Sequence, residues 1–192
     1  FFLFAVSLRY THNESTFIMR LLRLGRQEDD MPTFEAVLKQ YERPIYWHIR
    51  RMVVNHEDAQ DVMQETFIRV YQGLGSLRKK EMLKVWLYRI ATNECIRHLN
   101  KMKERAMSEL SEEDVLLNRL TASEQVDWED VEGVRLQKAI LRLSQQERTV
   151  FNMRYYDELS YEEIRQVTGG KVATLKVAYH HAKEKIKAEL LN

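Results

Sequence analysis

The stretch SYEEIRQVTGGKVATLKVAYHHAKEKI, residues 160–186, decides the fold of the C-terminal part of this chain. Ser160 and Glu163 have the spacing of a capping box, which predicts that a short helix begins directly after the serine. The Gly169–Gly170 pair then turns the chain, because glycine adopts the left-handed backbone that a short turn needs. A second helix is predicted from about Val172, so the stretch indicates a helix-turn-helix.

The two helices of this motif are expected to pack through Ile164, Leu175 and Ala178. The second helix would then turn a mixed set of side chains outward: Lys171, Thr174, Lys176, Val177, His180 and Lys183. Lysine suits phosphates, while Thr, Val and His near a helix start can touch base edges in the major groove of DNA. An ordinary helical hairpin with a lysine-rich solvent face is the alternative. Arg165 stands where the contact between the helices usually needs a small residue, so its side chain is expected to reach out to solvent.

The composition of the whole chain also favours helices. The 192 residues include only two prolines and six glycines, and 44% are hydrophobic, which predicts an all-α protein of one or two small domains. The single cysteine, Cys95, excludes an internal disulfide and is expected to be a small buried side chain.

Charge is unevenly distributed along the chain, although the net charge is only +1. Residues 31–103 hold 13 basic and 8 acidic residues, residues 104–135 hold 3 and 10, and residues 136–192 hold 10 and 7. Two basic lobes therefore flank an acidic connector. A polyanion can be held by both lobes, whereas the connector would repel it and discourage the free chain from binding DNA.

Residues 84–105, KVWLYRIATNECIRHLNKMKER, predict a helix with two different faces. The apolar face carries Leu83, Leu87, Ala91, Cys95, Leu99 and Met102. The other face combines an aromatic ring, guanidinium groups and amides: Trp86, Arg89, Asn93, Arg97 and Asn100 or Lys101. Bases stack on aromatic side chains and phosphates pair with Arg and Lys, so this face is interpreted as a site for a single strand of nucleic acid. The alternative places Trp86 in the core and the other residues in solvent.

The segments that precede this helix are also predicted to be largely helical. A helical pattern runs from Pro32 to about Asn55, with a kink or a break between two helices expected at Pro44. Another helix is predicted over NHEDAQDVMQETFIRVYQGLG, with Asn55 and Asp58 as possible caps and with Gly73 and Gly75 ending it. The opening FFLFAVSL is too short to cross a bilayer and is interpreted as part of an N-terminal extension, with Met19 or Met31 nearer to the natural start.

These motifs together resemble an RNA polymerase sigma factor of the extracytoplasmic-function (ECF) group of the sigma-70 family. DAQDVMQETFIRVY (58–71) resembles the polymerase-binding helix of that family, and WLYRIATNECIRHLNK (86–101) resembles its promoter-melting helix. The segment from Leu143 to Ile186 resembles its C-terminal domain. The resemblance covers residues 31–192 with the motifs in the family's order.

The resemblance implies two small helical domains: sigma region two over 31–104 and sigma region four over 133–192, joined by an acidic flexible linker over 105–132, after the extension 1–30. It implies that core polymerase contacts Asp58, Asp61, Gln64, Glu65 and Arg69. It implies minus-ten DNA contacts from the basic loop and the melting helix: Arg78, Lys79, Lys80, Trp86, Arg89, Asn93, Arg97 and Lys101. The outward set from Lys171 to Lys183 would contact the minus-thirty-five element.

Partners and chemistry are implied in the same way. The resemblance implies a bacterial, cytoplasmic protein that is not an enzyme and needs no cofactor. Its partners would be the β′ and β subunits of core polymerase, promoter DNA and an anti-sigma factor, with no stable membrane insertion. No metal site is expected either, since His180 and His181 are adjacent and point about 100° apart on a helix.

The sequence departs from the family pattern at several positions. Arg97 and His98 stand where many members have Asp followed by a basic residue, and Arg165 replaces the usual Ala. Ala178, His181 and Lys183 stand where Arg is common, so fewer or weaker phosphate contacts are expected.

Two other classes of protein were weighed against this prediction. A stand-alone helix-turn-helix regulator would bind its DNA unaided, whereas a sigma factor needs core polymerase. A helical enzyme is disfavoured, because the sequence offers no Glu-x-x-His pair, phosphate-cradling glycine loop, Cys/His cluster or Ser/His/Asp grouping at a supporting spacing.

Overall fold

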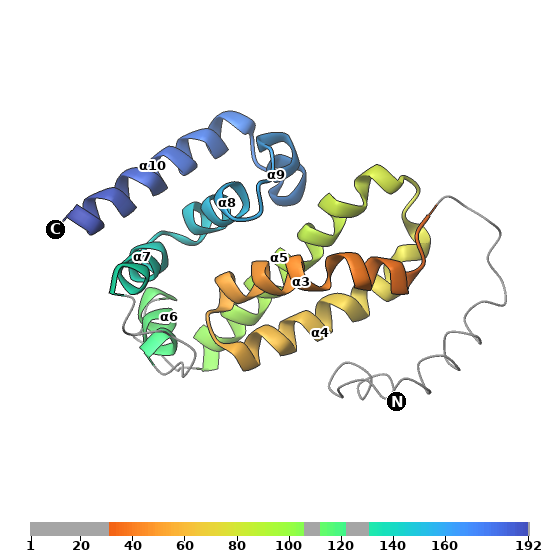
Figure 1. The fold of residues 1–192 in the computed structure, drawn as a ribbon, viewed down its shortest axis with the longest axis horizontal. Coiled ribbons are helices and arrows are strands. Elements are labelled where there is room, and N and C mark those ends of the chain that lie inside the picture. Colours follow the sequence, from red (N-terminus) through yellow and green to blue (C-terminus); the bar gives the residue numbers. More distant parts are fainter. Residues whose placement is uncertain (1–30, 106–111, 122–130, 192) are drawn as a thin grey trace.

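The computed structural model describes residues 31–105, 112–121 and 131–191, and every regular element within these ranges is a helix. The first three α-helices pack against one another and form the N-terminal bundle: α3 (Phe34–Val53), α4 (His56–Gly73) and α5 (Leu83–Arg105). Two short 3₁₀ turns, Leu74–Ser76 and Lys80–Met82, lie between α4 and α5. The C-terminal bundle contains α7 (Val131–Leu141), α8 (Gln145–Tyr155), α9 (Tyr161–Thr168) and α10 (Val172–Leu191) (Figure 1).

Side-chain caps begin several of these helices. The Asn55 side chain accepts hydrogen bonds from the backbone N–H groups of Glu57 (2.7 Å) and Asp58 (3.2 Å) at the start of α4. Complete capping boxes open α8 at Ser144 and α9 at Ser160. Because each cap satisfies backbone donors that the helix itself leaves free, helix starts are encoded locally.

Pro44 lies inside α3, which runs continuously from Phe34 to Val53, so of the two outcomes expected there, a kink or a break, the break is wrong. Pro44 is exposed, while Val37 before it and Ile45 and Ile49 after it are fully buried in one core. Packing of both halves against the same neighbours outweighs the hydrogen bond that proline removes.

The helix-turn-helix prediction is confirmed. Gly169 adopts the left-handed conformation (φ +78°), and its N–H donates to the carbonyl oxygen of Arg165 at 2.8 Å. Ile164, Leu175 and Ala178 are buried between α9 and α10. The Arg165 side chain extends into solvent as expected and pairs with Glu162, with 2.8 Å between Nε and Oε1.

The segment expected to be an acidic linker contains a further helix, α6 (Glu112–Thr121), which contacts α5 and α7. Its Leu116 and Leu120 are buried, and residues 106–111 and 122–130 of the expected linker lie outside the described residues. The extension 1–30 also lies outside them. Within the part of the chain that is described, no helix combines the length and apolarity needed to span a membrane.

Buried apolar residues continue from one bundle into the other. One cluster includes Ile49, Met52 and Leu87 of the N-terminal bundle together with Met153 and Ile164 of the C-terminal bundle. Helix α9 packs on α5, and α8 packs on α3 (Figure 1). A second cluster lies within the C-terminal bundle alone: Ala139, Ile140, Leu143, Phe151, Ala182 and Ile186.

Candidate polymerase and nucleic-acid interfaces

The outward face of α10 has the composition that the sequence predicted. All six side chains expected there are exposed: Lys171, Thr174, Lys176, Val177, His180 and Lys183. Two of the lysines are positioned by aromatic rings, with Lys176 Nζ 5.8 Å from the centre of the Tyr161 ring and Lys183 Nζ 5.7 Å from that of Tyr179. These cation–π contacts hold the ammonium groups at the surface of the helix, where a phosphate can reach them.

A largely apolar hollow of about 270 Å³ lies at the start of α5. It is lined by Leu77, Arg78, Lys79, Met82, Val85, Trp86 and Arg89. Four residues of the predicted minus-ten set, Arg78, Lys79, Trp86 and Arg89, therefore meet here. Lys80 is exposed in the neighbouring 3₁₀ turn. An apolar floor with an aromatic wall and cations at the rim can hold a flat base and its phosphate.

Trp86 serves both the core and this hollow. It is half-buried and packs against the hydrophobic core, as its alternative interpretation expected, and it also lines the hollow. Its ring lies over Gly73 at the end of α4, where a Cβ atom would come within 2.8 Å of Trp86 Cζ2. Only glycine at position 73 leaves room for the ring in this place.

The predicted nucleic-acid face of α5 does not form one surface. Asn93 is exposed about one turn beyond Arg89, but Arg97 and Lys101 line a second hollow with Asp61, Val62 and Glu65 of α4. Arg89 and Lys101 are 12 residues apart, which at 100° per residue separates them by about 120° around the helix axis. The two ends of α5 therefore face different neighbours.

The second hollow is crossed by ion pairs that join α4 to α5. The Glu94 side chain is 6% exposed and accepts from Arg69 Nε at 2.5 Å and from Arg97 Nη1 at 2.6 Å. His98 Nε2 lies 3.1 Å from Asp58 Oδ1. The role of Glu94 was not predicted from the sequence. An acidic residue between two cationic positions of a helix gives no sign that it is buried rather than exposed to solvent.

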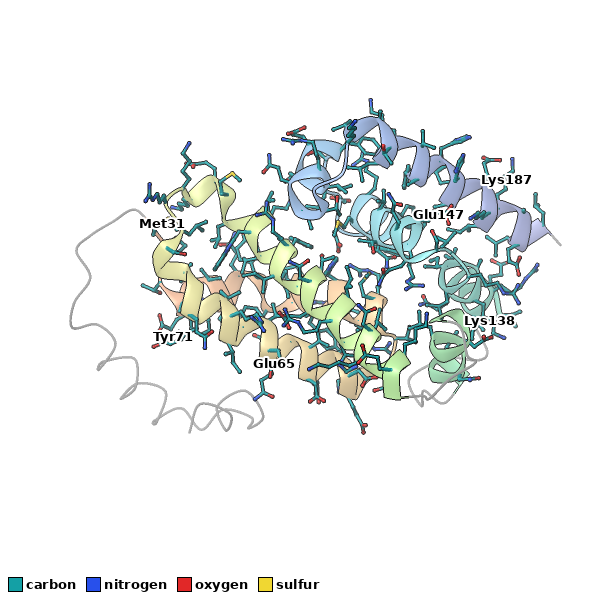
Figure 2. All side chains as sticks on the ribbon, turned by 180° about the vertical axis from the view of Figure 1, so that it is seen from behind. Met31, Glu65, Tyr71, Lys138, Glu147 and Lys187 are labelled. Atoms are coloured by element: carbon teal, nitrogen blue, oxygen red, sulfur yellow. The ribbon has the colours of Figure 1, made fainter. Side chains whose placement is uncertain are left out.

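The residues expected to contact polymerase share α4. Asp61, Glu65 and Arg69 are exposed, whereas Asp58 and Gln64 are half-buried. Glu65 projects from the outer side of α4, away from the C-terminal bundle (Figure 2). This surface is open to a partner even with the two bundles in contact.

Cys95 is fully buried, as expected from the sequence. Burial raises the pKa of its thiol, mainly by desolvating the thiolate form, with the neighbouring Glu94 charge acting in the same direction. The thiol is therefore a packing group in the core of the N-terminal bundle. Among the described residues, no group of three or more His, Cys, Asp or Glu side chains is arranged to hold a metal ion.

Comparison with known proteins matches both bundles to one family. The model of sigma-70 region 2 matches residues 37–105, and that of sigma-70 region 4 matches residues 133–186. The ECF RNA polymerase sigma factor SigW of Bacillus subtilis is 30% identical over 172 residues, which cover 85% of this chain and 92% of SigW. The chain belongs to the ECF group of the sigma-70 family.

Other relatives of this sigma factor agree. The RNA polymerase sigma-H factor of Pseudomonas aeruginosa is 31% identical over 168 residues, 83% of this chain and 87% of that protein. Two solved structures share the fold. The sigma factor RpoE of Bartonella quintana, in complex with the anti-sigma factor NepR, has a TM-score of 0.64 at 19% identity and covers 82% of this chain and 96% of its own. CnrH, in complex with the cytosolic domain of CnrY, has a TM-score of 0.58 at 18% identity, and the match covers 82% of this chain and 86% of CnrH.

The family prediction and the all-α prediction are thus confirmed. This sigma factor is an initiation factor that recognises promoters with core RNA polymerase, and a helix-turn-helix regulator acting alone is the weaker interpretation.

Proposed function

We propose that this sigma factor divides its work among three surfaces. The exposed side of α4, with Asp58, Asp61, Gln64, Glu65 and Arg69, docks on the β′ subunit of core polymerase. The hollow at the start of α5 holds an unpaired base of the minus-ten element. The outward face of α10 enters the major groove of the minus-thirty-five element. The observation that carries this proposal is that cations line both the Trp86 hollow and α10, on two different bundles.

The minus-ten site is centred on Trp86, whose ring supplies a stacking surface, and on the cations Arg78, Lys79 and Arg89 around the hollow. Lys80 and Asn93 extend this site at its edges. Arg97 and Lys101, which lie toward α4, contribute flanking contacts to phosphates. The base preference of this site is open to experiment, because Arg97 replaces a residue type that many family members have there.

The domain assignment belongs to the same proposal: region two over 31–104, an acidic linker over 105–132 and region four over 133–192. The protein acts in the cytoplasm, where core polymerase is found, and performs no catalysis of its own. The β subunit contacts region four. An anti-sigma factor regulates the protein, as supported by the two structural neighbours, which were solved with the anti-sigma factor NepR and with a domain of CnrY.

Run-off transcription with purified core polymerase on a library of promoters tests this proposal. We expect specific transcripts only when both the sigma factor and core polymerase are present, and the enriched templates identify the two promoter elements. A chain that never joins core polymerase, yet shifts a specific duplex unaided, would instead be a stand-alone regulator.

The docking surface is tested by Asp61→Lys. A partner surface that binds the acidic side of α4 is expected to be basic, so a lysine at position 61 would repel it. We therefore expect the affinity for core polymerase to fall at least about tenfold. Glu42→Lys, an equal charge change at an exposed position of α3, is the control. Gel filtration with core polymerase measures association, and circular dichroism checks the fold. Retained binding of the Asp61 variant would place the docking site elsewhere.

A further inference from the structure

A buried carboxylate of the C-terminal bundle, Asp157, contacts two side chains of the N-terminal bundle. Asp157 lies between α8 and α9, and its side chain is 2% exposed. Its Oδ2 lies 2.6 Å from His48 Nδ1, and its Oδ1 accepts from the Arg51 guanidinium; both of these residues belong to α3. An ionised carboxylate only accepts hydrogen bonds, so in this contact His48 Nδ1–H is the donor and Asp157 Oδ2 the acceptor.

Residues of α5 hold His48 in position for its contact with Asp157. It is fully buried, and its Nε2 lies 3.1 Å from Thr92 Oγ1 of α5. Tyr88, also on α5, packs edge-on against the imidazole with 5.1 Å between the ring centres. Arg51 is in turn covered by the Tyr156 ring, 4.8 Å from its Cζ. Polar groups buried in this way are stable only while each partner stays in place.

A second set of contacts covers part of the proposed minus-ten site. Arg89 Nε donates to the backbone carbonyl oxygen of Gln166 at 3.0 Å, and a second guanidinium nitrogen donates to the same oxygen. This oxygen is in the last turn of α9, where carbonyl groups lack helical partners and the helix dipole favours a cation. Lys84 Nζ lies 3.1 Å from Glu163 Oε1 beside it. Arg89 is therefore already occupied by the C-terminal bundle.

Apolar packing extends the same interface. Met52 of α3 contacts Asn152 of α8, with 3.7 Å between Met52 Sδ and Asn152 Nδ2, and the main hydrophobic cluster includes residues of both bundles. The interface thus combines buried apolar surface with charged groups that fit one arrangement only.

We propose that Asp157, with His48 and Arg51, forms a latch that keeps the free sigma factor closed and withholds Arg89 from the promoter strand. The role of Arg89 in this statement rests on the proposed function. Opening removes Asp157 from His48 and Arg51 and releases Arg89 from α9. Core polymerase or DNA that engages both bundles separately must supply this free energy. The latch acts through direct contacts between α3, α5, α8 and α9, and it does not require the charge of the acidic connector.

The size of the effect follows from a two-state equilibrium. If about 90% of free chains are closed, a roughly tenfold weaker latch leaves about half of them closed. The open fraction then rises about fivefold, and the apparent affinity for a ligand of the open form rises by the same factor.

The test compares Asp157→Asn with Glu132→Gln in the full-length chain. Both variants replace one carboxylate of the C-terminal bundle by an amide, but Glu132 is exposed on α7. Fluorescent labels on Glu42→Cys of α3 and Lys187→Cys of α10 report the distance between the bundles by energy transfer; both positions are exposed, and the native Cys95 is buried and stays unlabelled (Figure 2 shows Lys187). Binding of a pool of short single-stranded oligonucleotides of random sequence is measured on the same proteins.

We expect Asp157→Asn to lower energy transfer and to raise the affinity for the oligonucleotide pool about fivefold, with Glu132→Gln unchanged in both. Energy transfer that is unchanged in Asp157→Asn would overturn the latch, whatever the protein does in transcription. Lowered energy transfer with unchanged affinity would overturn the masking of Arg89. Failure of the proposed function is seen separately, as absence of run-off transcripts with the wild-type chain.

Arg51→Gln provides a second way of releasing Asp157 if the Asn variant folds poorly, because Arg51 is at the edge of the interface with 21% of its side chain exposed. We expect a smaller drop in energy transfer, since His48 remains in place. No change in a folded Arg51 variant would argue that Arg51 is not part of the latch.

Discussion

The Trp86 ring packs against Gly73 and leaves no room for a larger residue at position 73. The indole ring of Trp86 lies where a side chain at position 73 would begin, and Trp86 also lines the hollow proposed to receive a base. The glycine was predicted as a helix end, and it does end α4. Gly73 also leaves room for the Trp86 ring. This second role depends on how α4 packs on α5, so no local sequence pattern indicates it.

Gly73→Ala is therefore expected to displace the Trp86 ring. The new Cβ would lie 2.8 Å from Trp86 Cζ2, so the ring or the end of α4 must move. We expect the free energy of unfolding to fall by about 1–3 kcal/mol, measured by denaturant titration. In a Trp86→Leu background the same substitution should cost little, because the ring is absent. An equal cost in both backgrounds would show that the two residues are not coupled.

At the scale of elements, α8 shows how local and distant contacts reinforce each other. Its capping box joins Ser144 to Glu147, and Lys185 of α10 donates to both Glu147 carboxylate oxygens at 2.8 Å. Burial by itself would raise the pKa of Glu147, but the hydrogen bonds from Lys185 and Ser144 outweigh it and lower the pKa. The start of α8 is thereby tied to the far part of α10, behind the recognition face.

The lowered pKa of Glu147 predicts how the stability of the C-terminal bundle depends on pH. Because the folded value lies below that of the unfolded chain, the carboxylate contributes stability above the unfolded value of about 4.3 and loses it as the pH falls through the folded value. Glu147→Gln should cost about 1 kcal/mol at neutral pH and flatten the acid limb of a stability–pH curve. Glu132→Gln should leave that limb unchanged. An unchanged curve for the Glu147 variant would mean that the ion pair contributes nothing.

The exposed lysines of α10 predict a salt effect on promoter binding. If Lys176 and Lys183 each neutralise one phosphate, each alanine substitution should reduce the slope of log affinity against log salt by about 0.9. The measurement uses the holoenzyme on a duplex selected in the run-off experiment. Lys187→Ala, an exposed lysine farther along α10, is the matched control and should not change the slope. Unchanged slopes for both test variants would argue against α10 as the reading helix.

At the scale of the whole molecule, the main feature is that the two bundles share buried contacts. The C-terminal bundle covers parts of α3 and α5, while the side of α4 that we propose as the docking surface stays exposed. Such an arrangement lets core polymerase bind one bundle first and separate the other afterwards. It also couples the stabilities of the bundles, because unfolding either one exposes the buried His48 and Asp157 of the interface.

Calorimetry tests this coupling. We expect the wild-type chain to unfold in one cooperative transition and Asp157→Asn to unfold in a broader or split transition, since its bundles stabilise each other less. Glu132→Gln should keep a single transition. Two resolved transitions in the wild-type chain would show that the contact between the bundles adds no measurable stability.

The predictions that succeeded depend on short-range rules. The capping box at Ser160, the turn at Gly169 and the burial of Cys95 all follow from residue type and spacing. The break that was one of the two outcomes expected at Pro44 does not occur, because packing on both sides of the proline outweighs its local preference. The proposed face of α5 was predicted from its spacing on a helix and the polymerase contacts from the family resemblance, but the division of that face between two hollows was not predicted.

The amino-acid sequence by itself determined the helices, the helix-turn-helix and the family of this sigma factor, because helix periodicity, caps and glycine turns act over a few residues and the family motifs are contiguous. Only the tertiary structure decided which face of α5 meets which neighbour, that Gly73 accommodates Trp86, and that Asp157 reaches His48 across 109 positions of the chain. Those pairings depend on how whole helices pack, and packing is a property of the summed buried surfaces rather than of any local pattern.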